Sequence, residues 1–107
     1  MQQLTPVELA DWLSRTDGEK PLLLDVREAW EYSHCHIEDS VHVPMQAVPG
    51  RITEWEEDAP IIAICHHGAR SLQVAHFLEQ HGFKQVYNLS GGVDAWAKTV
   101  DHAMPTY

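Results

Sequence analysis

The chain of 107 residues has only two cysteines, few basic side chains and no long hydrophobic run. Two cysteines cannot form a disulfide framework, so nothing indicates an oxidising compartment. Seven Lys and Arg against sixteen Asp and Glu give a formal net charge of −9, which repels nucleic-acid backbones and anionic bilayers. The longest apolar run, residues 61–65, is far shorter than the ~20 residues of a membrane span, and the first residues do not resemble a secretion signal. We therefore expect one cytoplasmic domain over residues 1–107 that binds neither nucleic acid nor membranes.

Segments with helical periodicity alternate along the chain with short apolar segments that are typical of buried strands. Strands are expected at residues 22–26, 41–43, 61–64 and 86–89. Helices are expected from Pro6, capped by Thr5 and Glu8, to a stop at Asp17–Gly18, and over residues 28–34, 47–57, 69–81 and 93–98. This alternation indicates an α/β fold with a mostly parallel sheet, in which ligands bind beyond the carboxyl ends of the strands. Cys65 directly follows one of these strands.

Residues 65–71, Cys-His-His-Gly-Ala-Arg-Ser, follow a predicted buried strand and begin a predicted helix. The free N–H groups and the dipole at a helix start favour the thiolate form of Cys65. Gly68 permits a backbone conformation closed to most residues, so that several amides can point at one atom. Arg70 adds a permanent charge on a planar fork that suits oxyanions. The segment predicts an anion-binding loop around a sulfur nucleophile, and a buried structural cysteine is the alternative.

Four segments resemble the signatures of the single-domain rhodanese-like sulfurtransferases, in the order and at the spacing of that family. They are Leu-Leu-Asp-Val-Arg-Glu at 23–28 with Glu-Tyr at 31–32, the stretch from 35 to 44, the loop 65–71, and Leu-Ser-Gly-Gly at 89–92 with Trp96. The resemblance implies a five-stranded, mostly parallel sheet flanked by helices, and no cofactor. Two departures from the family signatures lie between the helix expected at 28–34 and the strand expected at 41–43. Cys35 replaces a usual glycine, and Asp39–Ser40 replaces a glycine-alanine pair, so the resemblance does not determine the backbone conformation there.

The resemblance also implies the chemistry of the loop. Cys65 matches the nucleophile that takes a sulfane sulfur from a donor such as thiosulfate and holds it as a persulfide. A thiophilic acceptor, either cyanide or a thiol, then removes that sulfur. Arg70 matches the arginine that closes the loop. The resemblance implies that the other loop residues bind substrate through their backbone amides: His66, His67, Gly68, Ala69 and Ser71. The side chains of both histidines would line the mouth of the loop.

Two other functions remain open beside a thiosulfate sulfurtransferase. Phosphatases and arsenate reductases of a related type also use a cysteine-to-arginine loop, but they enclose five residues, whereas Cys65 and Arg70 enclose four. A shorter loop favours one sulfur atom over a tetrahedral oxyanion. The other possibility is a sulfur-relay carrier or binding module, which exchanges sulfur with a protein donor or acceptor.

Three groups of polar residues outside the loop could have either a structural role or a role in the site. Asp25 and Arg27 end a core strand at the same edge as Cys65 and could tune the site, but a buried pair that fixes the loops is favoured. Residues 34–36, His-Cys-His, lack the further ligands of an organised metal site, so no metal is predicted, and His36 is expected to pack or hydrogen-bond within the domain. Nothing in the sequence brings Cys35 close enough to Cys65 to serve as a resolving cysteine.

Two further groups of residues are assigned to structure. Trp30 and Trp96 are expected in the core, because aromatic side chains dominate burial in small domains, although either could line a pocket. The acidic residues 54–58 are expected on a solvated face.

Overall fold

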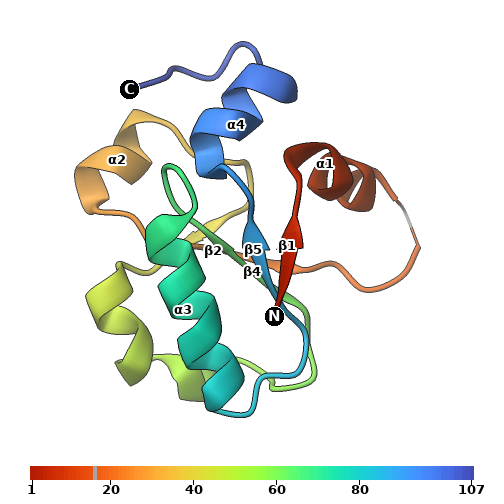
Figure 1. Ribbon diagram of the computed structural model, residues 1–107, viewed down its shortest axis with the longest axis vertical. Helices are drawn as coiled ribbons and strands as arrows, with labels where there is room; N and C mark the ends of the chain where they lie inside the picture. The colour runs from red at the N-terminus through yellow and green to blue at the C-terminus, as the bar shows by residue number, and fades with distance from the viewer. Residues whose placement is uncertain (16) are drawn as a thin grey trace.

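The computed structural model describes residues 1–15 and 17–107 and contains a five-stranded sheet (Figure 1). The strand order is β1-β5-β4-β2-β3, and each pair of neighbouring strands runs parallel. The strands are β1 (Gln2–Leu4), β2 (Leu22–Asp25), β3 (Val41–His42), β4 (Ile61–Ile64) and β5 (Val86–Leu89). The predicted α/β fold with a five-stranded sheet is therefore confirmed.

The described residues also form four α-helices and two short 3₁₀ helices, of which all but the last lie between strands. They are α1 (Pro6–Ser14), α2 (Ala29–His34), η1 (Met45–Gly50), η2 (Ile52–Glu54), α3 (Ala69–Gln80) and α4 (Gly92–Thr99). In the parts of the chain that the structure describes, no helix has the length and apolar character that a membrane crossing requires.

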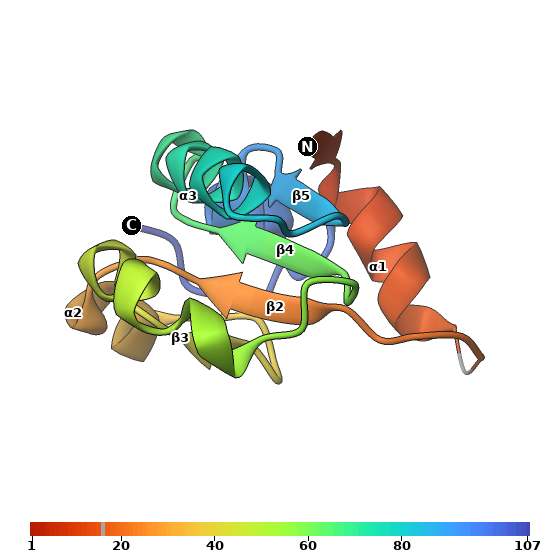
Figure 2. The same cartoon turned by 90° about the horizontal axis from the view of Figure 1, so that it is seen from below.

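Two apolar layers lie on opposite faces of the sheet. Successive side chains of a strand alternate between the faces, so Ile61 and Ala63 of β4 belong to one layer and Ile62 and Ile64 to the other. The helix α3 and the η1 segment cover the first face (Figure 2), whereas α1 and α4 cover the second. Because β4 is buried on both faces, its sequence is a continuous apolar run rather than an alternating one.

The start of α1 agrees with the sequence prediction. The Thr5 hydroxyl accepts the backbone N–H of Glu8, and the Glu8 carboxylate accepts the backbone N–H of Thr5. This reciprocal capping box satisfies two donors that have no partner within the helix. The predicted extension of α1 to Asp17–Gly18 passes through Thr16, which lies outside the described residues.

Three sequence expectations differ from the structure. The α-helix predicted over residues 47–57 is instead η1 and η2, because Pro49 lacks an N–H and its ring obstructs the preceding turn. The edge strand β1 was not expected, since its residues Gln-Gln-Leu are too short and polar to show a strand pattern. Trp30 is 60% exposed, so its placement in the core was wrong, whereas Trp96 is 7% exposed and confirms the prediction.

The connection between α2 and β3 accommodates its unusual sequence. Asp39 has φ +68°, the left-handed conformation that glycine adopts freely and that aspartate tolerates better than most residues. The Ser40 hydroxyl donates to the carbonyl of Ile37, and the backbone N–H of Ser40 donates to the same carbonyl. The ring of His36 stacks on that of Tyr32, and its Nδ1 is hydrogen-bonded to the backbone carbonyl of Tyr32. This confirms that His36 packs and hydrogen-bonds within the domain. The acidic residues of segment 54–58 are exposed, as predicted.

Candidate active site

Cys65 lies directly after β4 and is 1% exposed. Its Sγ accepts the backbone N–H of Gly68 at 3.0 Å and lies 3.2 Å from the Ser71 hydroxyl. The loop is anchored to the start of α4, because the carbonyls of Cys65 and His66 accept the backbone N–H groups of Val93 and Asp94. The sulfur is therefore buried in a fixed polar environment at the carboxyl edge of the sheet.

Gly68 gives the loop its shape. Its φ of +106° lies in the left-handed region, as the sequence predicted, and it immediately precedes α3. A Cβ at this position would lie 3.3 Å from the nitrogen of Gly91 and 3.5 Å from the carbonyl oxygen of Leu89. A side chain at position 68 would therefore strain the turn that points its N–H at the sulfur.

A buried hydrogen-bond chain supports the sulfur from the side of β5. The Ser71 hydroxyl also contacts Oδ1 of Asn88, whose Nδ2 donates to the carbonyl of Gly68 and to Oε1 of Gln3. A hydroxyl has one proton, so Ser71 donates either to a Cys65 thiolate or to Asn88. In the second case its oxygen can accept a proton from a Cys65 thiol. These hydrogen bonds can thus serve both protonation states of Cys65.

Most of these hydrogen bonds were not predicted from the sequence. Ser71 was expected to contribute only its backbone, and no role was predicted for Asn88. The available signal was a polar residue inside the apolar segment 86–89, since buried amides require partners.

Arg70 is paired rather than free. Its Nη1 and Nη2 donate to the two carboxylate oxygens of Glu31 at 2.7 and 2.8 Å. This bidentate contact lowers the pKa of Glu31 to about 2 despite burial, and it raises the pKa of Arg70. The guanidinium of Arg70 was predicted to bind an oxyanion, but both of its Nη groups donate to the carboxylate of Glu31 in α2.

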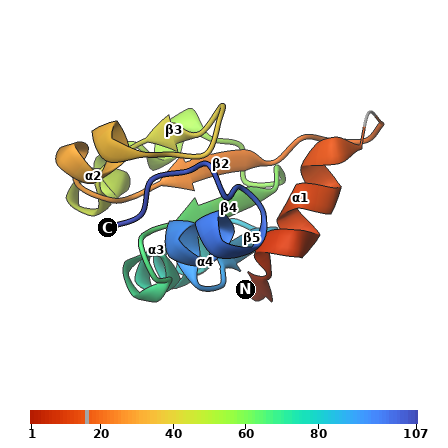
Figure 3. The same ribbon diagram turned by 90° about the horizontal axis from the view of Figure 1, so that it is seen from above.

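Tyr107 joins this pair to a second one. Its hydroxyl donates to Oε2 of Glu31 and accepts from Nη1 of Arg27, both at 2.8 Å. Burial raises the pKa of Tyr107 to about 12. The segment after α4 returns toward α2 (Figure 3), and this fold-back brings Tyr107 beside Trp30. No local sequence pattern could have predicted this contact, because residues 31 and 107 are far apart in the chain.

Asp25 and Arg27 form a fully buried ion pair of 2.7 Å. Arg27 also donates to the carbonyl of Cys35 at 2.6 Å and to that of Glu31 at 3.3 Å. The pair therefore connects the end of β2 to the end of α2.

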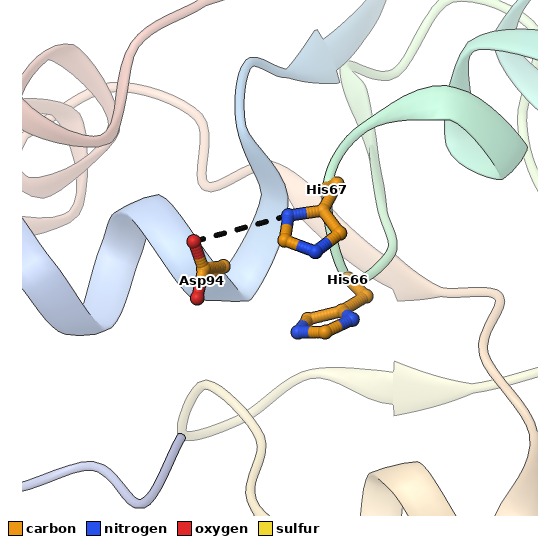
Figure 4. Close-up of side chains that lie close together, drawn as sticks. All are labelled: His66, His67 and Asp94. Atoms are coloured by element: carbon orange, nitrogen blue, oxygen red, sulfur yellow. Dashed lines mark ion pairs between the residues drawn. The ribbon is translucent and has the colours of Figure 1, made fainter. Parts of the chain in front are cut away.

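The two histidines of the loop lie beside α4. The ring of His66 lies between those of His67 and Tyr107, at centroid distances of 3.9 Å, and it stacks on Tyr107 but is tilted by 33° against His67. Burial lowers the pKa of His66. His67 is exposed, and its Nδ1 lies 3.8 Å from a carboxylate oxygen of Asp94 (Figure 4). Ala69, the remaining loop residue, is exposed at the first position of α3.

The two cysteines belong to different layers. Cys35 packs in the apolar layer with Leu23 and Ile64, and Cys65 packs in the layer with Ala63 on the other face of the sheet. Both are free thiols. The sheet separates them, which disfavours Cys35 as a resolving cysteine.

Comparisons with known proteins agree with the resemblance in the sequence. Residues 5–99 match the family model of the rhodanese-like domain. A sulfurtransferase of Allochromatium vinosum is 38% identical over 83% of this chain and 80% of its own length. The thiosulfate sulfurtransferase GlpE of Actinobacillus pleuropneumoniae is 32% identical over 78% of this chain and 77% of its own.

Two further similar proteins are a sulfur carrier and a protein of known structure. A putative sulfur carrier protein of Bacillus subtilis, YrkF, is 37% identical over 84% of this chain, which spans 49% of that protein. The crystal structure of a rhodanese-like domain protein from Staphylococcus aureus is 25% identical, with a TM-score of 0.84 over 100% of this chain and 99% of that one.

Proposed function

The chain belongs to the rhodanese-like sulfurtransferase family, and we propose that it moves a sulfane sulfur from thiosulfate or a persulfide donor to cyanide or a thiol. The intermediate is a persulfide on Cys65. The observation that carries this proposal is the sulfur of Cys65 itself, buried at the end of β4 and bonded by the N–H of Gly68 at 3.0 Å. Such a site can stabilise a negative charge on sulfur without solvent.

The first step is a displacement at sulfur. The Cys65 thiolate attacks the sulfane sulfur of thiosulfate, a sulfur–sulfur bond forms, and the bond to the sulfonate sulfur breaks. Sulfite leaves with the bonding electron pair, and the enzyme retains a persulfide anion. In the second step cyanide attacks the outer sulfur, thiocyanate leaves, and the Cys65 thiolate is restored. Neither step requires an external oxidant or reductant.

The residues around the loop have separate roles in this proposal. The N–H of Gly68, the Ser71 hydroxyl and the start of α3 hold the negative charge on sulfur. Arg70 contributes less to this charge, because Glu31 offsets its own charge. Arg70 then acts as a positioning residue that ties the loop to α2. Asp25 and Arg27 hold the connection beyond α2 and have no direct part in the chemistry.

The paired state of Arg70 also disfavours phosphatase or arsenate reductase activity. A phosphate would require the guanidinium fork that Glu31 occupies, within a loop that encloses four residues rather than five. A sulfur-relay role is the second candidate, and the name of YrkF supports it. In that case the donor or acceptor is a protein thiol, and the Cys65 persulfide is the same.

Intact mass after thiosulfate treatment tests the proposal. The native protein and Cys35→Ser should each gain the mass of one sulfur and lose it on addition of cyanide. Cys65→Ser should gain none and produce no thiocyanate. Cys35→Ser is a matched control, because both cysteines are buried free thiols in opposite layers of the same sheet. Sulfur gained by Cys65→Ser, or an aryl phosphatase activity that this variant loses, would refute the assignment.

Persulfidated protein, freed of thiosulfate, separates an enzyme from a relay carrier. Rapid discharge to cyanide or small thiols supports the free-standing enzyme. Discharge that occurs only to a protein thiol supports the relay role.

A further inference from the structure

Three potential metal ligands meet beside the loop, outside the bonds that the sulfur chemistry uses. His66 and His67 belong to the loop, and Asp94 lies in the first turn of α4. One donor atom from each of them lies within 4.8 Å of the other two. In Figure 4, His66 and His67 lie on the same side of the loop, and one ring nitrogen of each is directed toward Asp94.

His66 carries an unused donor atom. Its Nε2 is buried and has no hydrogen-bond partner among the residues that the structure describes, and no other side-chain nitrogen or oxygen there shares this state. A buried polar atom without a partner is unfavourable, so native structures seldom retain one without a reason. Stacking against Tyr107 holds the ring in this orientation.

The protein backbone fixes the two elements of the cluster relative to one another. The N–H of Asp94 donates to the carbonyl of His66 at 3.1 Å, so the carboxylate and the imidazole are attached to a common hydrogen-bonded frame. His67 has a side chain that is 66% exposed and can rotate. Tetrahedral zinc ligands lie about 3.3 Å apart, so the donors, which lie within 4.8 Å of one another, must approach by at most about 1.5 Å.

We propose that His66, His67 and Asp94 bind one divalent transition-metal ion of the zinc class. Two imidazoles and one carboxylate suit this class, and a fourth position remains for water or an exogenous ligand. Lys98 donates at 2.9 Å to Oδ2 of Asp94, the oxygen that also lies 3.8 Å from Nδ1 of His67, and a carboxylate oxygen has a second lone pair for the ion. The sulfur of Cys65 is not a ligand in this proposal, because it is buried against Gly68 and Ser71.

Zinc titration of the tag-free Cys65→Ser protein tests this site without any requirement for sulfur transfer. Competition with a chromophoric chelator gives the stoichiometry and affinity, and this background removes the thiolate as a ligand. We expect one zinc ion per chain. His67→Ala and Asp94→Asn should each weaken binding at least ten-fold, since even the loss of an outer-shell partner of a metal ligand commonly costs about 10–100-fold.

Matched controls separate the proposed site from scattered histidine binding. His76→Ala removes an exposed histidine from α3, and Asp58→Asn removes an exposed carboxylate, so neither should change zinc affinity. His67 is exposed and Asp94→Asn preserves side-chain shape, so both test variants should fold, and circular dichroism verifies this. Absence of stoichiometric zinc binding, or equal affinity in all four variants, would overturn the proposal.

Cobalt(II) provides a second readout on the protein with Cys65 intact. Ligation by nitrogen and oxygen gives weak visible absorption, whereas ligation by a thiolate adds an intense sulfur-to-metal charge-transfer band in the near ultraviolet. We expect the visible bands alone, and their loss in Asp94→Asn. A charge-transfer band that disappears in Cys65→Ser would overturn the proposed ligand set.

Discussion

The ion pair between Glu31 and Arg70 should make the stability of this protein depend on pH in a way that one substitution removes. Glu31 has a side chain that is 4% exposed, and it accepts both Nη donors of Arg70. This hydrogen-bonded contact lowers the pKa of Glu31 from 4.5 to about 2. At about 1.36 kcal/mol per pKa unit, the ionised state stabilises the fold by at most about 3.4 kcal/mol.

Solvent reduces this upper bound. The side chain of Arg70 is 36% exposed, so water screens the pair, and we expect a contribution of about 2 kcal/mol. Because the pKa of Glu31 is lower in the folded than in the unfolded protein, the ionised carboxylate stabilises the fold at neutral pH. It is lost as the pH falls below 4.5 toward 2, and more than half is lost by pH 3, where the unfolded carboxyl is protonated.

Urea unfolding of native protein and Glu31→Gln at pH 7, 5 and 3 measures this contribution. We expect Glu31→Gln to lower the free energy of unfolding by about 2 kcal/mol at pH 7 and by less than about 1 kcal/mol at pH 3. Glu54→Gln is the control, because the Glu54–Arg51 pair is exposed, and its urea midpoint should match that of the native protein. A destabilisation by Glu31→Gln that is equal at pH 7 and pH 3 would refute the electrostatic reasoning.

Two further predictions concern packing. Trp96→Ala should lower the free energy of unfolding by about 3–5 kcal/mol, whereas Trp30→Ala should change it by less than about 1 kcal/mol, because these side chains are 7% and 60% exposed. Equal effects in urea unfolding would contradict the assignment of the two rings. Gly92→Ala should cost at least about 2 kcal/mol, since φ is +61° and a Cβ would lie 2.3 Å from the carbonyl oxygens of Cys65 and His66. A Cβ at position 50 would have no atom within 4 Å, so the melting temperature of Gly50→Ala should lie within a few degrees of the native value. Equal melting temperatures of Gly92→Ala and Gly50→Ala would exclude a tight contact between the loop and α4.

The local features of this protein were determined by its sequence. The apolar run of β4, the capping box at Thr5 and Glu8, and the left-handed glycine at position 68 all depend on neighbours within a few residues. Periodicity and backbone sterics act over that range, so a single sequence is sufficient to predict them. The position of Cys65 at a strand end followed from the same reasoning.

The partners of the loop were decided by tertiary structure alone. Arg70 meets Glu31 from α2, Ser71 meets Asn88 from β5, and Tyr107 returns from the end of the chain. Each contact depends on the order of strands in the sheet and on the path of the chain after α4, neither of which a local pattern encodes. Burial then fixes the outcome, because a charged or polar group removed from water must be satisfied by whatever partner the fold brings within reach. For Arg70 that partner is a carboxylate, so the guanidinium fork that the sequence predicted for a substrate anion is bonded within the protein itself.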